Sequence, residues 1–186
     1  RYTFRAGPLR AAPVTASAAA REGQRLTDAI LDEPHLWTDT NGGTRLAATL
    51  RRNLGKMGGR SLETTNAWTP GEDSVAEQTA LYADKIAEGK AADVGLMRYH
   101  PWALVRDLSD VGELREALQG LYADAPWVDV ERVMAEVHDL GTHPADARRY
   151  YLNAVTTADD QLVAPHEWDA CRSEERLEEG DTIVLG

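Results

Sequence analysis

Arg-Leu-Thr-Asp-Ala-Ile-Leu-Asp-Glu, residues 25–33, climbs from polar to apolar residues and ends on two acids. This pattern predicts a short buried strand followed by a functional turn. Pro34 prevents a helix from continuing and keeps Glu33 out of the α-helical region. An apolar strand ending in Asp-Glu is typical of a Walker B motif, which carries acids to the carboxyl edge of a sheet, where α/β proteins bind ligands. Taken singly, the same residues also fit a solvated surface turn.

The two acids have separate expected roles if this is a Walker B strand. Asp32 would hold Mg²⁺, usually through water, and Glu33 would orient or deprotonate the attacking water. The partner motif, G-x-x-x-x-G-K-[ST], is absent, because neither Gly-Lys pair, at residues 55–56 and 89–90, is followed by Ser or Thr. The chain is therefore either not a P-loop protein, or its phosphate loop lies upstream of Arg1.

The rest of the chain alternates a helix and a strand and then becomes mostly helical. Apolar residues at helical spacing predict a helix from Thr44 to Met57, ended by Gly58-Gly59, and then a short strand over residues 60–65. Ser74 with Glu77 forms a capping box, and residues 110 and 113 have the same spacing. Helices are expected over residues 74–88, 110–121, 130–140, 144–152 and 165–168, a loop over 5–24, and a strand starting at 181.

Composition excludes several classes of protein. The net charge of −11 argues against a generic nucleic-acid coat, because phosphate contacts need Lys and Arg. Cys171 is the only cysteine, so neither an internal disulfide nor a four-cysteine zinc site can form. No apolar run approaches the roughly 20 residues that a membrane span needs. The first residues, Arg-Tyr-Thr, contain no Met and are interpreted as a cut end.

Several blocks, beginning with the Asp-Glu pair, together resemble the ATPase domain of tailed-phage terminase large subunits, especially those of phages infecting actinobacteria. Their order and spacing match, and the similarity covers most of residues 25–186. The blocks are Asp-Glu-Pro-His-Leu-Trp (32–37), Asn-Gly-Gly (41–43), Arg-Asn-Leu-Gly-Lys (52–56), Glu-Thr-Thr-Asn-Ala (63–67), Pro-Gly-Glu-Asp-Ser-Val-Ala-Glu (70–77), Pro-Ala-Asp-Ala-Arg-Arg-Tyr-Tyr-Leu-Asn (144–153) and Trp-Asp-Ala-Cys (168–171).

The resemblance implies an α/β fold, namely a partial P-loop NTPase sheet of the ASCE type with a helical lid subdomain. Residues 1–73 would be the C-terminal part of the ATPase core, 74–141 the lid and 142–180 a linker region. Residues 181–186 would begin the first strand of a nuclease domain with an RNase H-like fold, whose metal-binding acids fall outside these residues.

The resemblance also implies roles for particular residues. Asp32 and Glu33 would be the metal-associated acid and the catalytic glutamate. Thr64, Thr65 and Asn66 match the coupling motif, which ends the next strand and senses the γ-phosphate of ATP.

The family also uses an arginine finger in the loop ahead of the Walker B strand, inserted into the site of a neighbouring subunit. Either Arg21 or Arg25 would fill that role, with Arg21 slightly favoured. Such a finger stabilises charge on the transferring phosphoryl group.

The full protein would then be an ATPase and nuclease that uses ATP and Mg²⁺ and works in the host cytoplasm during virus assembly. Its expected partners are the portal protein, the small terminase subunit, double-stranded DNA and neighbouring copies in a ring, without a membrane. This chain alone is expected to be inactive, since it lacks the phosphate loop. The alternative is a non-enzymatic α/β-helical interaction module whose Asp-Glu pair is a surface turn.

Overall fold

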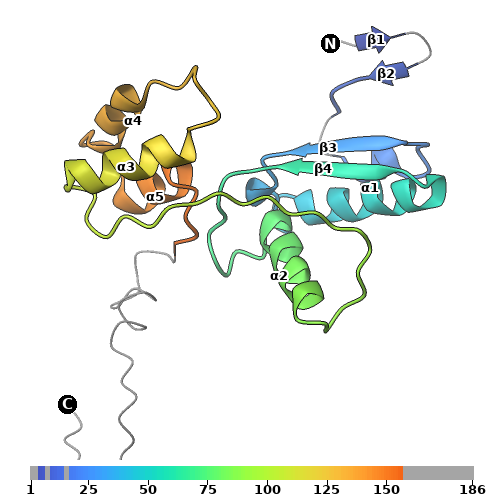
Figure 1. Cartoon of the computed structure of the whole chain (residues 1–186). Helices are drawn as coiled ribbons and strands as arrows, with labels where there is room; N and C mark the ends of the chain where they lie inside the picture. Colours follow the sequence, from blue (N-terminus) through green and yellow to red (C-terminus); the bar gives the residue numbers. More distant parts are fainter. Residues whose placement is uncertain (1–3, 7–8, 15–16, 157–186) are drawn as a thin grey trace, which may run out of the picture.

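The computed structural model describes residues 4–6, 9–14 and 17–156 (Figure 1). This part is a small mixed α/β chain with a two-stranded parallel sheet and five α-helices. The elements are β1 (Phe4–Ala6), β2 (Leu9–Ala11), the 3₁₀ turn η1 (Ala19–Arg21), β3 (Asp28–Asp32), the 3₁₀ turn η2 (Pro34–Leu36), α1 (Gly43–Met57), β4 (Arg60–Thr64), α2 (Val75–Ala87), α3 (Val111–Leu121), α4 (Val130–Val137) and α5 (Pro144–Tyr151). The expected helix at 165–168 and the strand from 181 lie outside the described residues.

The expected strand, helix and second strand form one β3–α1–β4 unit. β3 and β4 pair in parallel, with Asp28 opposite Arg60 and Asp32 opposite Thr64. Figure 1 shows α1 lying along one face of the pair. Leu31 points to that face and is fully buried in a small core. The core collects apolar residues from the start of η1, β3, α1 and the start of α2: Ala18, Leu31, Leu46, Ala47, Leu50 and Val75.

The opposite face of the sheet has no covering layer in the described part of the chain. Ile30 and Leu62 face each other across the two strands and are 72% and 57% exposed. Two large aliphatic side chains side by side in water are uncommon on the central part of a sheet, whose faces usually pack against helices or a second sheet. The two-stranded sheet is therefore covered on one face, and its other face exposes a pair of aliphatic side chains between polar ones.

The return from α1 to β4 depends on glycine. Gly58 ends the helix with φ +63°, and its backbone N–H donates to the carbonyl of Leu54. A side chain at that φ would be strained, which is why glycine commonly follows helices. At Gly59 a Cβ would collide with the backbone carbonyl of Thr27. The Gly58-Gly59 pair thus both stops the helix, as predicted, and lets β4 start against β3.

The predicted capping box begins α2, although the Glu side chain is used differently. The Ser74 hydroxyl, fully buried, accepts the Glu77 backbone N–H at 3.3 Å. The Glu77 carboxylate reaches back and accepts the N–H groups of Gly71 and Asp73, at 2.8 and 2.7 Å. The backbone N–H of Val75 also donates to the carbonyl of Trp37, at 2.9 Å. These bonds fix the start of α2 beside the turn that follows β3.

Replacing Ser74 with Ala should lower the free energy of unfolding by about 1 kcal/mol, because the cap of α2 is lost and the backbone N–H of Glu77 is left without its partner. Urea denaturation followed by circular dichroism measures the change. Ser61→Ala is the matched control, since Ser61 is exposed on β4. Equal midpoints for the two variants would contradict a stabilising role for this cap.

The helices α3, α4 and α5 pack into a second core of their own. It consists of Val105, Leu114, Leu118, Met134, Val137, Ala147, Leu152 and Ala154. Leu140, predicted to continue the apolar face of α4, lies beyond the end of that helix and is fully exposed. Asp139 accepts the N–H of Gly141 at 2.7 Å in a turn there, which ends the helix earlier than the apolar spacing indicates.

The grouping of helices bears on the expected lid over residues 74–141. α2 packs against η2 and α1, whereas α3 and α4 pack with α5. Ala147 and Leu152, which fall in the expected linker region 142–180, belong to the second core. The division into core, lid and linker stays a prediction. Within the described residues, no helix is long and apolar enough to cross a membrane.

The start of the chain differs from the expected loop. β1 and β2 form a short antiparallel hairpin, with Phe4 opposite Ala11 and Ala6 opposite Leu9. Strands of three residues leave too few positions for an alternating pattern to be recognised in the sequence.

Candidate functional site

Asp32 and Thr64 end neighbouring parallel strands and meet at the same edge of the sheet. They are register partners, and the Thr64 hydroxyl donates a hydrogen bond of 2.9 Å to Oδ1 of Asp32. Both side chains are exposed. A carboxylate and a hydroxyl held together at the carboxyl ends of two strands are oxygen donors of the kind that Mg²⁺ prefers.

Glu33 continues the strand pairing for one residue and then turns sharply. Its backbone N–H donates to the carbonyl of Thr64 at 2.8 Å, yet its φ of 52° lies in the left-handed region. A non-glycine residue in that conformation costs of order 1–3 kcal/mol and is concentrated at functional sites. Glu33 is thus outside the right-handed α-helical region, as expected, but it adopts the left-handed conformation rather than the extended one that a following proline favours.

His35 is the residue at this edge that motif reasoning did not single out. The short turn η2 returns its side chain under the ends of both strands, where it is only 4% exposed. Its ring Nδ1 lies 3.0 Å from the Thr65 hydroxyl and 3.0 Å from Oε2 of Glu33. His35 therefore contacts one residue from each of the two predicted motifs.

Burial lowers the pKa of the His35 imidazole below its usual value of 6.5, and this effect outweighs the opposing charge of Glu33. Arg149 lowers the pKa further, and Glu72 raises it. The histidine is thus held in its neutral form in the folded protein at a pH where an unfolded chain would begin to take up a proton.

We expect His35 to make the folded chain less stable as the pH falls. The unfolded state binds a proton near pH 6.5, whereas the folded state resists it, so the stability that is fully present above that pH is lost as the pH falls from 6.5 toward the lower folded pKa. Melting temperatures measured between pH 7.5 and 5.5 should therefore decline less steeply for His35→Asn than for the unchanged chain. His138→Asn, at an exposed histidine, is the control and should keep the original slope. An unchanged slope for His35→Asn would contradict the expectation.

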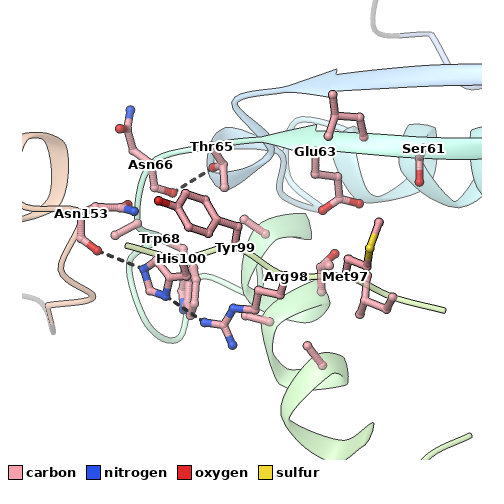
Figure 2. A pocket seen from close by; sticks show the side chains of 17 residues that line it. Ser61, Glu63, Thr65, Asn66, Trp68, Met97, Arg98, Tyr99, His100 and Asn153 are labelled. Carbon is pink, nitrogen blue, oxygen red and sulfur yellow. Dashed lines mark hydrogen bonds between the residues drawn. The ribbon is translucent and has the colours of Figure 1, made fainter. Parts of the chain in front are cut away.

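The remaining predicted coupling residues follow Thr64 directly. The Thr65 hydroxyl donates to the backbone carbonyl of Asn66 at 2.9 Å, as Figure 2 shows, and accepts the His35 backbone N–H at 3.3 Å. Asn66 lines a pocket on the other side of β4 from β3. The structure thus brings Asp32, Thr64 and Thr65 to one edge and places Asn66 beside it.

Neither candidate arginine finger lies at this edge. Arg21 and Arg25 precede the amino end of β3, whereas Asp32 ends the strand. Arg21 is half-buried in η1, with its Nη1 3.5 Å from Gln24, while Arg25 is exposed. A finger acting in a neighbouring subunit would have to project away from its own site, so this placement leaves both residues as candidates.

Among the described residues, no three His, Cys, Asp or Glu side chains gather as a metal cluster. Magnesium sites that bind nucleotides typically use one or two carboxylates, with phosphate and water filling the remaining positions. Asp32 and Thr64 fit that smaller donor set, with Glu33 next to them.

The pocket beside β4 has a volume of about 190 Å³. Ser61, Leu62 and Glu63 form its β4 side, alanines of α2 form its floor, and residues 96–100 form its far wall. Figure 2 shows Met97 near Glu63 and Tyr99 near Thr65, so the far wall runs alongside β4 without pairing with it.

The chain is similar to two bacteriophage proteins. It is 27% identical to the Gene 13 protein of Mycobacterium phage L5, in an alignment that covers 100% of this chain and 36% of the relative. It is also 27% identical to the Gene 13 protein of Mycobacterium phage D29, which covers 91% of this chain and 32% of the relative. The chain therefore spans about one third of the length of these relatives. No family profile and no solved structure matches it.

Proposed function

We propose that this chain is the water-activating and coupling part of a terminase large subunit, the ATP-hydrolysing motor that moves double-stranded viral DNA into the procapsid. The observation that carries the proposal is the shared edge of β3 and β4, where Thr64 donates to Asp32 and Glu33 turns out of the strand. Ligands of open α/β sheets bind at this kind of edge. The bacteriophage origin of the similar proteins fits a role in a virus.

The finer fold proposed is one part of a P-loop NTPase sheet of the ASCE type. In the described chain β4 pairs with β3 alone, and the pocket opens along its other edge. Met97 and Tyr99, on the far wall, are 93% and 86% exposed. One further strand placed between β4 and residues 96–100 would satisfy the unpaired backbone groups of β4 and cover these side chains. A strand that leads into a phosphate loop would then end beside Thr64, one strand away from Asp32.

ATP is the proposed substrate, and Mg²⁺ would neutralise charge that develops on the transferring phosphoryl group. Asp32 would hold the metal, and Thr64 keeps that carboxylate oriented through its hydrogen bond. Glu33 would take a proton from the attacking water as the water oxygen bonds to the γ-phosphorus and the bond to the departing ADP oxygen breaks. Thr65 and Asn66 would change partners when the phosphate leaves.

We assign assembly, DNA cleavage and the arginine finger to a longer protein of which this chain would be a part. It would act as a ring on the portal with the small terminase subunit, carry a separate nuclease domain, and use an arginine finger from position 21 or 25. Arg51 and Arg52 pair with Glu63 and Glu22 at 2.6 and 3.1 Å, so part of their positive charge is offset within the chain. With a net charge of −11, the main grip on DNA would come from another part of the protein.

Asp32→Asn should lower Mg²⁺-dependent ATP turnover by the longer protein about 100-fold, because the metal loses its carboxylate. Asp28→Asn is the matched control, since Asp28 starts the same strand and forms an exposed ion pair with Arg60 at 3.0 Å. Such exposed pairs contribute little. The assay is phosphate release at saturating ATP, with the 186-residue chain expected to show none.

Equal turnover by the two Asp variants would contradict the assignment of Asp32. A longer protein without any ATPase activity, with or without DNA, would instead favour the non-enzymatic interaction module.

A further inference from the structure

His35 presents one hydrogen-bond donor to two acceptors. The Thr65 hydroxyl donates its own proton to the carbonyl of Asn66, so toward the imidazole it can only accept. The Nδ1 atom of His35 therefore carries the ring proton and donates it to Thr65 at 3.0 Å. This assignment leaves Nε2 as a bare acceptor, and Nε2 is buried without a hydrogen-bond partner among the described residues.

Glu33 lies equally close to the same proton but does not receive it. Its Oε2 is 3.0 Å from Nδ1, yet this buried oxygen has no hydrogen bond among the described residues, because the ring N–H is aligned with Thr65. A buried carboxylate oxygen without a donor is uncommon, because burial removes its water and nothing replaces that hydrogen bond. A small rotation of the imidazole would transfer the hydrogen bond from Thr65 to Glu33.

We propose that His35 is a positioning residue that couples the Glu33 carboxylate to the Thr65 hydroxyl, its Nδ1–H bonded to Thr65 in one state of the site and to Glu33 in the other. The inference rests on the proposed ATPase function and adds a residue to it. No proton is transferred: the ring keeps its Nδ1 proton and changes only the acceptor.

The two states differ in what holds the Glu33 carboxylate. With His35 bonded to Thr65, as in the structure, Oε2 accepts no hydrogen bond. When the Thr65 hydroxyl turns to another partner, Nδ1–H is released to Oε2 and fixes the orientation of the carboxylate. Thr65 thereby controls whether Glu33 is positioned to activate water.

The imidazole also contacts α5. Its ring meets the ring of Tyr150, in α5, edge to face, with centroids 6.1 Å apart. Arg149, the preceding residue of α5, donates a hydrogen bond to Thr69 in the segment after β4. It also forms an ion pair with Asp146 in its own helix, at 2.6 Å. Rotation of the His35 ring would therefore change its contact with α5. Movement of α5 would in turn favour either Thr65 or Glu33 as the acceptor of the Nδ1 proton.

The test uses kcat and KM for ATP of the longer protein and of three variants. His35→Leu keeps the bulk of the side chain and removes the donor, and we expect kcat to fall about 10- to 100-fold with KM changed less than about 3-fold, as for a misplaced catalytic group. His35→Asn puts an amide donor where Nδ1 was and should restore most of the lost kcat. Thr65→Val leaves the donor to Glu33, so kcat should fall less than in His35→Leu, and the double variant should show the loss of His35→Leu alone.

The outcomes separate this inference from the function on which it rests. An unchanged kcat for His35→Leu, or multiplied losses in the double variant, would overturn the coupling role while leaving the ATPase assignment intact. Full loss in both Leu and Asn variants, with intact melting curves, would also overturn it, because a donor at the Nδ1 position would then not suffice. Absence of turnover in the unchanged longer protein would remove the proposed function itself.

Discussion

Glu33→Gln in the longer protein should reduce ATP turnover about 100- to 10,000-fold while nucleotide binding is retained, as expected when a general base is removed. Glutamine has the size of glutamate and can still accept a hydrogen bond from His35, but it cannot take a proton from water. Turnover is measured by phosphate release, and binding is measured separately with a fluorescent ATP analogue. Measuring both turnover and binding distinguishes loss of the chemical step from loss of nucleotide binding.

Glu116→Gln is the control for this substitution, because Glu116 is exposed on α3, far along the chain from the strand edge. It should leave turnover within about 2-fold of the unchanged protein, as most surface substitutions do. Retained activity in Glu33→Gln would remove the role given to the carboxylate. Loss of nucleotide binding in the same variant would instead move Glu33 from the chemical step to the binding of ATP.

Leu31→Ala should cost about 2–5 kcal/mol of stability, because it empties a fully buried position between the sheet and α1. The neighbouring Ile30→Ala, on the exposed face of the same strand, should cost less than about 1 kcal/mol in this chain. Urea denaturation of the 186-residue chain gives both values under identical conditions. The pair tests whether β3 is covered on one face only.

The same pair has a second use in the longer protein. If further strands and helices complete the sheet, Ile30 becomes buried and its replacement should approach the cost of Leu31→Ala. A cost for Ile30→Ala that stays small in the longer protein would argue against a layer on that face. Equal costs in the short chain would contradict the burial seen at these two positions.

The local elements could be predicted because their signals are local. Pro34 and the two acids fix the end of β3, Gly58 fixes the end of α1, and Ser74 fixes the start of α2. Each of these residues acts within a few positions of itself through φ, a cap or a missing donor. The parallel pairing of β3 with β4 follows from the helix between them, because parallel strands need a crossover of this length.

What could not be predicted depends on contacts between distant residues. His35 gains its place only because η2 folds it under Thr65, thirty positions along the chain. A single histidine after Pro34 forms no spacing pattern from which its contact with Thr65 could be predicted. The early end of α4 before Leu140 likewise depends on a turn that apolar spacing does not indicate. The sequence signal for His35 was its position close to the candidate catalytic pair. Its burial in the structure is what distinguishes it from a surface histidine.

The most direct test is a structure of the longer protein with Mg²⁺ and a non-hydrolysable ATP analogue. We expect an additional strand hydrogen-bonded to the free edge of β4 at residues 61–64, the metal on the Asp32 side of the strand ends, and Glu33 facing the γ-phosphate through a water. A nucleotide bound away from this edge, or a β4 edge that stays unpaired while ATP is bound elsewhere, would contradict the assignment of β3 and β4 as the water-activating and coupling strands of a packaging motor.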